Sequence, residues 1–471
     1  MSESARSVAR ERSFALATLL LISLIASSHL WGPGLLNTRG GGDSPFLLLR
    51  THQLAVNLRA GVFPARWMPD AAYGFGYPFF SYYAALPYYL AAGFTLVGLD
   101  ILTAIKLTQT LFCAAAAVAM YYWSERVLRS RPGAWLAAVA YTVAPFHLVN
   151  VYVRGDSLSE FAAFAFYPLI LWGVDRLARR PTLRRVLVPA LAYAGLIVTH
   201  NVSALIFSPF LVFYVALHVL RFLSQESANG TRSKVLRSSL LILPLLVALL
   251  LSAWFWLPAL GETDAVQLDV QTTGYFSYLN HFRGVDLVQW EAIFDYATGR
   301  PQGSPFAMGL LQAILASAGM VVVVASYFRQ TIGLHRQEVS HAIEVADEKG
   351  LEPRLWALTF GVLGVFLSTW LITPLSRPLW DHLPLLPMVQ FPWRFLSVQA
   401  LFTAILTGAL VSALPSRWSP SRTWLAAGFL GALLTGTTLL GLRPQYLPIS
   451  ADEVTVERLQ LYELFTGNIG S

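Results

Sequence analysis

Apolar runs of about 20 residues recur along the chain, separated by short polar segments. An α-helix of about 20 apolar residues can cross a bilayer core, whereas a membrane barrel alternates apolar and polar residues in segments of about ten. The pattern therefore predicts an all-α membrane protein that crosses the bilayer many times. We expect about eleven spans, at roughly 14–36, 101–123, 135–152, 158–175, 186–201, 203–220, 238–258, 306–328, 355–374, 395–414 and 424–442.

One further apolar stretch, residues 79–99, is long enough to cross but is rich in tyrosine and interrupted by Pro87. We expect it to form a re-entrant or juxtamembrane hairpin on the outer side, because a full crossing would invert every later loop.

The expected spans define one membrane domain, residues 1–442. Its two large outer loops are residues 37–100 and 259–305, and a short outer tail, residues 443–471, follows it.

The polar loops divide into two sets by charge. With the hairpin outside, the inner segments hold 21 of the 33 basic residues and carry a net charge of +11, against −4 for the outer segments. Cytoplasmic loops carry such an excess of Lys and Arg, so the N-terminus is predicted to be cytoplasmic. The formal net charge of +7 is then a signal of topology and does not indicate a nucleic-acid partner.

Composition supports the same class. The 471 residues are 55% hydrophobic and 13% charged, whereas a soluble protein carries about 25% charged residues. The single cysteine, Cys113, lies within an apolar run, so an internal disulfide is excluded and a small membrane-buried side chain is expected.

Polar side chains gather, in this topology, at the outer ends of several spans. Ionisable groups at membrane depth are costly and tend to be functional, so we treat these side chains as candidate site residues. They are Asp43 and Arg50 after the first span, Arg154, Asp156 and Glu160 before the fourth, His200 and Asn201 in a tight turn, and Trp393 and Arg394 before the tenth. An acid among arginines and aromatics here suggests a site for a charged lipid-linked substrate.

Several candidates also have a purely structural explanation. Asp43 and Arg50 can belong to a solvated loop followed by an amphipathic surface helix at residues 45–60. His200 and Asn201 can satisfy backbone groups where two helices meet.

The acids before the fourth span leave two alternatives open. Ser157 and Glu160 match a capping box, with Ser157 as N-cap and Glu160 reaching back to it. Asp156 and Glu160 lie one helical turn apart, which suits a divalent cation or an arginine. Arg394 can extend its charged end to the membrane interface.

Six short segments together resemble a known family. They are Gly42-Asp43-Ser44-Pro45-Phe46 with Arg50, Gly61-Val62-Phe63-Pro64-Ala65-Arg66-Trp67, Gly74-Phe75-Gly76-Tyr77-Pro78, Arg154-Gly155-Asp156 through Glu160, Thr199-His200-Asn201, and Phe391-Pro392-Trp393-Arg394. In this order they resemble the C-fold membrane glycosyltransferases (the GT-C superfamily). In detail the chain is similar to the bacterial membrane family labelled "6-pyruvoyl-tetrahydropterin synthase-related", although no segment resembles a pterin enzyme.

The resemblance implies a multi-helix fold with its active site on the outer face of the bacterial cytoplasmic membrane. It implies a polyprenyl-phosphate-linked sugar as donor and an acid of the first outer loop, here Asp43, as catalytic base. Direct attack of an acceptor hydroxyl on the anomeric carbon predicts inversion of configuration.

The remaining charged candidates are expected to serve the donor. Arg50, Arg154 or Arg394 would stabilise the leaving phosphate. Asp156 and Glu160 would hold a divalent cation, Mg²⁺ or Mn²⁺, or orient one of these arginines.

The acceptor can be a protein, a lipid or a glycan. The sequence stops at residues 467–471, where longer relatives continue into an extracytoplasmic region, so a partner protein can supply part of the acceptor site. Two rival hypotheses are a catalytically silent subunit of a membrane complex and a lipid flippase or transporter. A transporter needs ionisable residues near the middle of the membrane, whereas the charged residues here cluster at one face.

Overall fold

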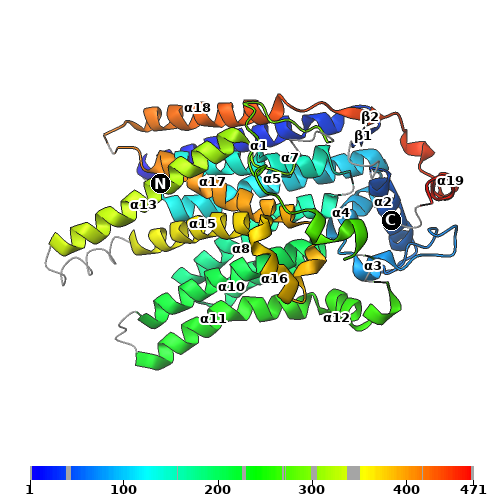
Figure 1. Ribbon diagram of the computed structural model, residues 1–471, viewed down its shortest axis with the longest axis horizontal. Coiled ribbons are helices and arrows are strands. Elements are labelled where there is room, and N and C mark those ends of the chain that lie inside the picture. Colours follow the sequence, from blue (N-terminus) through cyan, green and yellow to red (C-terminus); the bar gives the residue numbers. More distant parts are fainter. Residues whose placement is uncertain are drawn as a thin grey trace.

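Helices dominate the computed structural model, which describes residues 3–38, 44–155, 157–224, 230–267, 270, 272–298, 305–336, 351–415 and 417–467 (Figure 1). Most of the helices form one bundle (Figure 1). They are α1 (Glu3–Ser27), α5 (Ile101–Leu128), α6 (Arg131–Thr142), α7 (Pro145–Tyr152), α8 (Leu158–Arg179), α9 (Leu183–Thr199), α10 (Asn201–Ser224), α11 (Gly230–Leu251), α12 (Ala253–Gly261), α13 (Leu310–Arg336), α15 (Leu351–Ile372), α17 (Leu396–Ser412) and α18 (Pro420–Leu439).

Seven helical segments in the described ranges are long and apolar enough to cross a membrane, or nine if each of two bent pairs counts as one span. The bent pairs are α11 with α12, at 64°, and α15 with the segment 374–382, at 90°. The helical membrane-protein class is therefore confirmed, while the number eleven stays a prediction. The two expected spans outside this set correspond to α9, which has only 17 residues, and α18.

The stretch 79–99 forms two short helices, α3 (Phe79–Tyr82) and α4 (Leu86–Leu96). Pro87 lies in the first turn of α4, where its missing N–H leaves no helical bond unmade. An 11-residue helix is about 16 Å long, roughly half the bilayer core. Neither helix is long enough to cross alone, in keeping with the expected hairpin.

The helix expected at residues 45–60 is α2 (Pro45–Arg59), but it is not a surface helix. Ten of its 15 side chains are buried, polar Arg50, Thr51, Gln53 and Asn57 among them. The amphipathic surface interpretation was wrong because other segments cover the polar face of α2. Arg50 contacts α3 and α4, whereas Gln53 and Asn57 donate hydrogen bonds to Asp70 and to the carbonyl of Trp67 in the following loop.

The first apolar run does not remain helical to its end. After α1 and a 3₁₀ turn, η1 (Ser28–Trp31), the chain forms strand β1 (Leu35–Asn37), which pairs antiparallel with β2 (Gln445–Leu447). The tail continues into η9 (Ala451–Glu453) and α19 (Val456–Thr466), which lie beside α2 at the right end in Figure 1.

The tail is tied to the first loop by a buried carboxylate. Glu463 of α19 accepts hydrogen bonds from the backbone N–H groups of Ala72 (3.0 Å) and Tyr73 (2.9 Å). Both residues have positive φ, 52° and 58°, so their N–H groups form the concave arrangement that binds anions.

The centre of the bundle is formed by α6 and α17. A Cβ on Gly133 of α6 would lie 2.7 Å from the carbonyl oxygen of Gly408 of α17, so only glycine allows this close approach. α7 follows the far end of α6, and the 3₁₀ helix η8 (Pro392–Phe395) precedes the start of α17, so the packing of these two helices positions both elements at the other end of the pair.

The other short elements connect the bundle helices. They are η2 (Thr263–Ala265), η4 (Gly274–Phe276), η5 (Tyr278–Asn280), η6 (Pro374–Ser376), α16 (Arg377–His382) and η7 (Leu386–Val389).

The predicted orientation can be tested with single cysteines at exposed positions. In a Cys113→Ala background, we expect Thr182→Cys to resist an impermeant thiol reagent in intact cells and Val285→Cys to react, because the charge bias places them on opposite sides. Thr182 is exposed before α9, and Val285 is 99% exposed. Labelling of both sites in permeabilised cells is the control, and labelling of Thr182→Cys in intact cells would contradict the topology.

Candidate functional site

The site is centred on Glu160, in the first turn of α8. Its side chain is only 2% exposed, and its Oε2 accepts a hydrogen bond of 2.6 Å from Nη1 of Arg154. The same nitrogen donates to Oδ1 of Asn150 (2.6 Å), which fixes the arginine between α7 and α8. The capping-box interpretation was wrong: Ser157 makes no side-chain cap hydrogen bond, and Glu160 turns toward arginine.

A second arginine reaches the same carboxylate from the far end of the sequence. Nε of Arg394 lies 3.5 Å from Oε2 of Glu160. Its Nη1 donates to the carbonyl of Val389 (2.9 Å) and to Oε1 of Gln390 (3.1 Å). Because its side chain is only 10% exposed, Arg394 does not extend to the interface as the alternative predicted.

Gln390 has an unusual backbone conformation, with φ of 64°. Such a conformation in a non-glycine residue costs of the order of 1–3 kcal/mol and occurs most often at functional sites. Here it directs the Gln390 side chain to Arg394, so the strained turn serves to position the arginine.

Aromatic rings cover the two guanidinium groups. Arg154 lies 5.0 Å from the ring of Trp393, and Arg394 lies 5.0 Å from the ring of Phe391. Trp393 stacks between Phe391 (4.9 Å) and Phe306 (4.0 Å). Sequence reasoning selected Trp393 but missed Phe306, which belongs to a distant loop with no local signal.

His281 lies beside this stack, 4.6 Å from the ring of Phe391, and sequence reasoning missed it too. Burial lowers the pKa of His281, because desolvation disfavours the charged imidazolium. The neutral imidazole can act as a hydrogen-bond donor and acceptor at the edge of the site.

The expected turn between α9 and α10 is present, and its two polar residues, His200 and Asn201, have different surroundings. His200 is buried, and its Nδ1 lies 2.7 Å from Oγ of Ser203. Asn201 is exposed and donates to the carbonyl of Tyr82 in the hairpin (3.4 Å). His200 is therefore held inside the turn by Ser203, whereas Asn201 joins α10 to the hairpin.

Arg50 lies in a different cluster. Its guanidinium is 4.8 Å from the rings of both Phe79 and Tyr83, and its Nη1 donates to the hydroxyl of Tyr88 (3.2 Å). Cation–π contacts of this kind stabilise a buried arginine. The hairpin tyrosines thus surround Arg50.

Asp43 and Asp156 lie outside the described residues, but the residues next to them meet. The backbone N–H of Thr38 donates to Oγ of Ser44 (3.2 Å), which joins the two sides of the loop that carries Asp43. A Cβ on Gly155 would lie 2.5 Å from Oγ1 of Thr38 and 2.8 Å from Oγ of Ser44. The two acid-bearing segments are therefore in contact, directly beside Arg154.

Within the described residues, no three His, Cys, Asp or Glu side chains are grouped as a metal site would require. One buried carboxylate oxygen, Oε1 of Glu160, has no hydrogen-bond partner among them. A single such oxygen fits one ligand position of a hard cation such as Mg²⁺.

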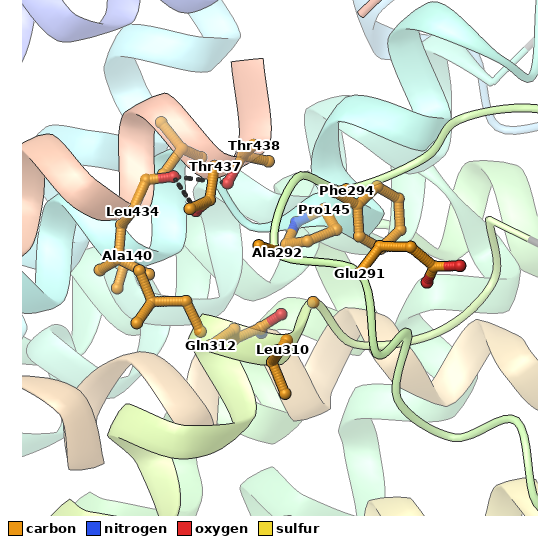
Figure 2. A pocket seen from close by; sticks show the side chains of 13 residues that line it. Ala140, Pro145, Glu291, Ala292, Phe294, Leu310, Gln312, Leu434, Thr437 and Thr438 are labelled. Carbon is orange, nitrogen blue, oxygen red and sulfur yellow. Dashed lines mark hydrogen bonds between the residues drawn. The ribbon is translucent and has the colours of Figure 1, made fainter. Parts of the chain in front are cut away.

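A cavity elsewhere in the protein is too small for a substrate. Figure 2 shows it between Thr437 and Thr438 of α18, Leu310 of α13 and Pro145, with the carboxylate of Glu291 pointing away from the threonines. Its volume of about 10 Å³ is roughly the space of one water molecule.

Comparison with known proteins identifies a family whose model matches most of this chain. The family model described as "6-pyruvoyl-tetrahydropterin synthase related domain; membrane protein" matches residues 80–441. An uncharacterized protein of Lactococcus lactis subsp. cremoris (strain MG1363) is 23% identical over 285 residues, which are 59% of this chain and 44% of the relative. The match thus spans less than half the length of this curated relative.

Two solved structures have a similar arrangement of helices. ArnT from Cupriavidus metallidurans bound to undecaprenyl phosphate is 14% identical, with a TM-score of 0.47 over 98% of this chain and 69% of that chain. The Archaeoglobus fulgidus oligosaccharyltransferase, in complex with Zn and sulfate, is 13% identical, with a TM-score of 0.44 over 95% of this chain and 53% of that chain. At these TM-scores neither structure assigns a role to any residue here.

Proposed function

We propose that this chain, which belongs to the 6-pyruvoyl-tetrahydropterin synthase-related family of membrane proteins, is an integral-membrane glycosyltransferase. It would move a sugar from a polyprenyl-phosphate-linked donor to an acceptor hydroxyl. The observation that carries the proposal is the convergence of Arg154 and Arg394 on one buried oxygen of Glu160, beside the contact between the loops of Asp43 and Asp156.

The two arginines suit the leaving group of this reaction. When the acceptor oxygen bonds to the anomeric carbon, the bond from that carbon to the phosphate oxygen breaks and its electron pair stays on the phosphate. Guanidinium groups already held in place stabilise the growing negative charge without reorganisation. Glu160 would act as a positioning residue, because it holds both arginines and lies too deep to receive the acceptor proton.

Asp43 would receive that proton. Thr38 and Ser44, on either side of the segment that carries Asp43, are hydrogen-bonded to each other and pack against Gly155. A base in this segment would therefore lie close to Arg154, which would hold the leaving phosphate. Attack from the face opposite the phosphate would invert the configuration of the sugar.

Two other candidates have different roles in the proposal. We assign Arg50 no contact with the phosphate, because aromatic rings surround it and it donates a hydrogen bond to Tyr88 in the hairpin. A divalent cation, if bound, would be held by Oε1 of Glu160 and by Asp156, and would supply further positive charge for the phosphate. The arginines alone can serve this purpose, so no step of the proposal depends on the cation.

The decisive experiment is consumption of a polyprenyl-phosphate sugar by the purified full chain. We expect release of polyprenyl phosphate together with a glycosylated product from co-purified lipid or added membrane extract. Binding of the donor without consumption would favour the silent-subunit hypothesis, and movement of intact donor across a vesicle membrane would favour the flippase.

The substitution Arg394→Lys tests whether the guanidinium of Arg394 binds the donor phosphate. Lysine keeps the charge but loses the planar fork that binds phosphate bidentately. We expect donor binding to weaken about 10-fold or more, because charge-assisted hydrogen bonds contribute about 1.5–3 kcal/mol. Titration of the donor against the purified protein measures this, with the exposed Arg458→Lys as the matched control. Equal affinity of the two variants would remove Arg394 from phosphate binding.

A further inference from the structure

The end of the bundle opposite Glu160 contains a cavity of about 340 Å³, here called the arginine cavity. The C-terminal ends of α5, α8 and α10 enclose it with the N-terminal parts of α11 and α15. Glu160 and Arg179 lie at opposite ends of α8, about 28 Å apart at 1.5 Å per residue. Five of the side chains that line the arginine cavity are arginines: Arg126, Arg129, Arg179, Arg221 and Arg237.

One carboxylate also lines the arginine cavity, and it is engaged in packing. Asp175 Oδ1 accepts a hydrogen bond from the hydroxyl of Tyr214 (2.6 Å) and lies 3.1 Å from Nε2 of His218. Nη2 of Arg126 donates to the backbone carbonyl of Asp175 (3.2 Å), not to its carboxylate. Among the residues that the structure describes, the lining therefore holds five arginines and one acid, a strong excess of positive charge.

The charge bias of inner loops explains why arginines occur at this end, and helix C-termini also attract cations. It does not explain why five of them face one space. Other arginines at the same end do not face the cavity and need no explanation beyond this charge bias. Arg176 packs over Trp172 (4.6 Å), Arg185 donates to the carbonyl of Arg176 (3.2 Å), and Arg184 is exposed. The lining arginines instead come from four helices that are separate in the sequence.

Arg129 provides a second, independent observation. It follows the last residue of α5 with φ of 54°, a left-handed conformation that costs a residue with a Cβ roughly 1–2 kcal/mol. Glycine is the usual residue at this position of a helix end. This strained residue lines the cavity, and strain of this kind gathers at ligand sites.

We infer that the arginine cavity binds a phosphate-bearing anion. Guanidinium groups bind phosphate oxygens in a bidentate manner. The negative charge of a phosphate bound among several arginines would offset the repulsion between them. The volume lies in the range of small-molecule sites, about 300–1,000 Å³, so there is space for a headgroup or a diphosphate beyond one phosphate group. The source is either an anionic phospholipid or a water-soluble phosphate compound. This site is separate from the proposed transferase site.

The test compares two probes on the purified full chain at low salt, where electrostatic binding is least screened. Binding of inorganic pyrophosphate is measured by calorimetric titration. Native mass spectrometry compares the bound fraction of dioleoylphosphatidylglycerol with that of dioleoylglycerol, which lacks phosphate. We expect one probe to bind, and Arg126→Gln with Arg221→Gln to weaken it at least 10-fold. The matched control, Arg176→Gln with Arg184→Gln, removes the same charge from the same end and should bind like the wild type.

The identity of the binding probe distinguishes the two sources. Ala178→Phe is a second variant that fills part of the cavity, keeps every arginine, and should also weaken binding. The inference is overturned if neither probe binds, if the control pair loses as much affinity as the cavity pair, or if a folded Ala178→Phe protein binds as the wild type does.

Discussion

Glu160→Ala is expected to lower the free energy of unfolding by about 3–5 kcal/mol. The change removes a buried carboxylate and leaves Arg154 and Arg394 side by side without the oxygen that both of them approach. Breaking a buried ion pair by deleting one partner has this cost because an uncompensated charge remains in a medium of low dielectric. Glu160→Gln should have a smaller effect, since its amide oxygen still accepts a hydrogen bond.

Thermal and denaturant-induced unfolding in detergent measure this effect. The control is Glu457→Ala, which removes an exposed carboxylate of the tail and should change stability by no more than about 0.5 kcal/mol. If the Glu160 variant is as stable as this control, the arginines do not depend on Glu160. The positioning role assigned to it would then be wrong.

Asp43→Asn is expected to lower turnover by roughly 10²–10⁴-fold with little change in donor binding or protein yield. Asparagine keeps the size of the side chain but cannot accept the acceptor proton, and general-base catalysis contributes about this factor. A loss confined to turnover is the signature of an interaction made in the transition state. Transfer assays with saturating donor, together with a donor titration, separate the two quantities.

The matched control for this prediction is Asp70→Asn in the same outer loop. Oδ2 of Asp70 accepts a hydrogen bond from Gln53 (3.0 Å), so its loss should act on stability more than on turnover. Near-normal sugar transfer by a folded Asp43→Asn protein would remove Asp43 from the mechanism. Asp156 would then be the next candidate base.

Local sequence features were sufficient to predict the helical class of this protein and several of its elements. Apolar runs predicted the bundle, and Pro87 with the nearby tyrosines predicted a hairpin. The pattern after Asp43 predicted a helix at residues 45–60, and α2 spans Pro45–Arg59. The tight turn at His200 was also correct. These features depend on partition into an apolar medium and on backbone preferences, which neighbouring residues determine among themselves.

The partners of the polar residues were decided by the tertiary structure alone. Glu160 matched a capping box equally well, and only the packing of η8 against α7 and α8 brings Arg394 to its carboxylate. The same holds for the aromatic rings around Arg50 and for the pairing of β1 with β2. Helical periodicity shows which face of a helix is apolar, but which helix ends meet depends on how all faces pack together. A buried charge then takes whichever partner that packing brings within reach, because leaving it without one costs several kcal/mol.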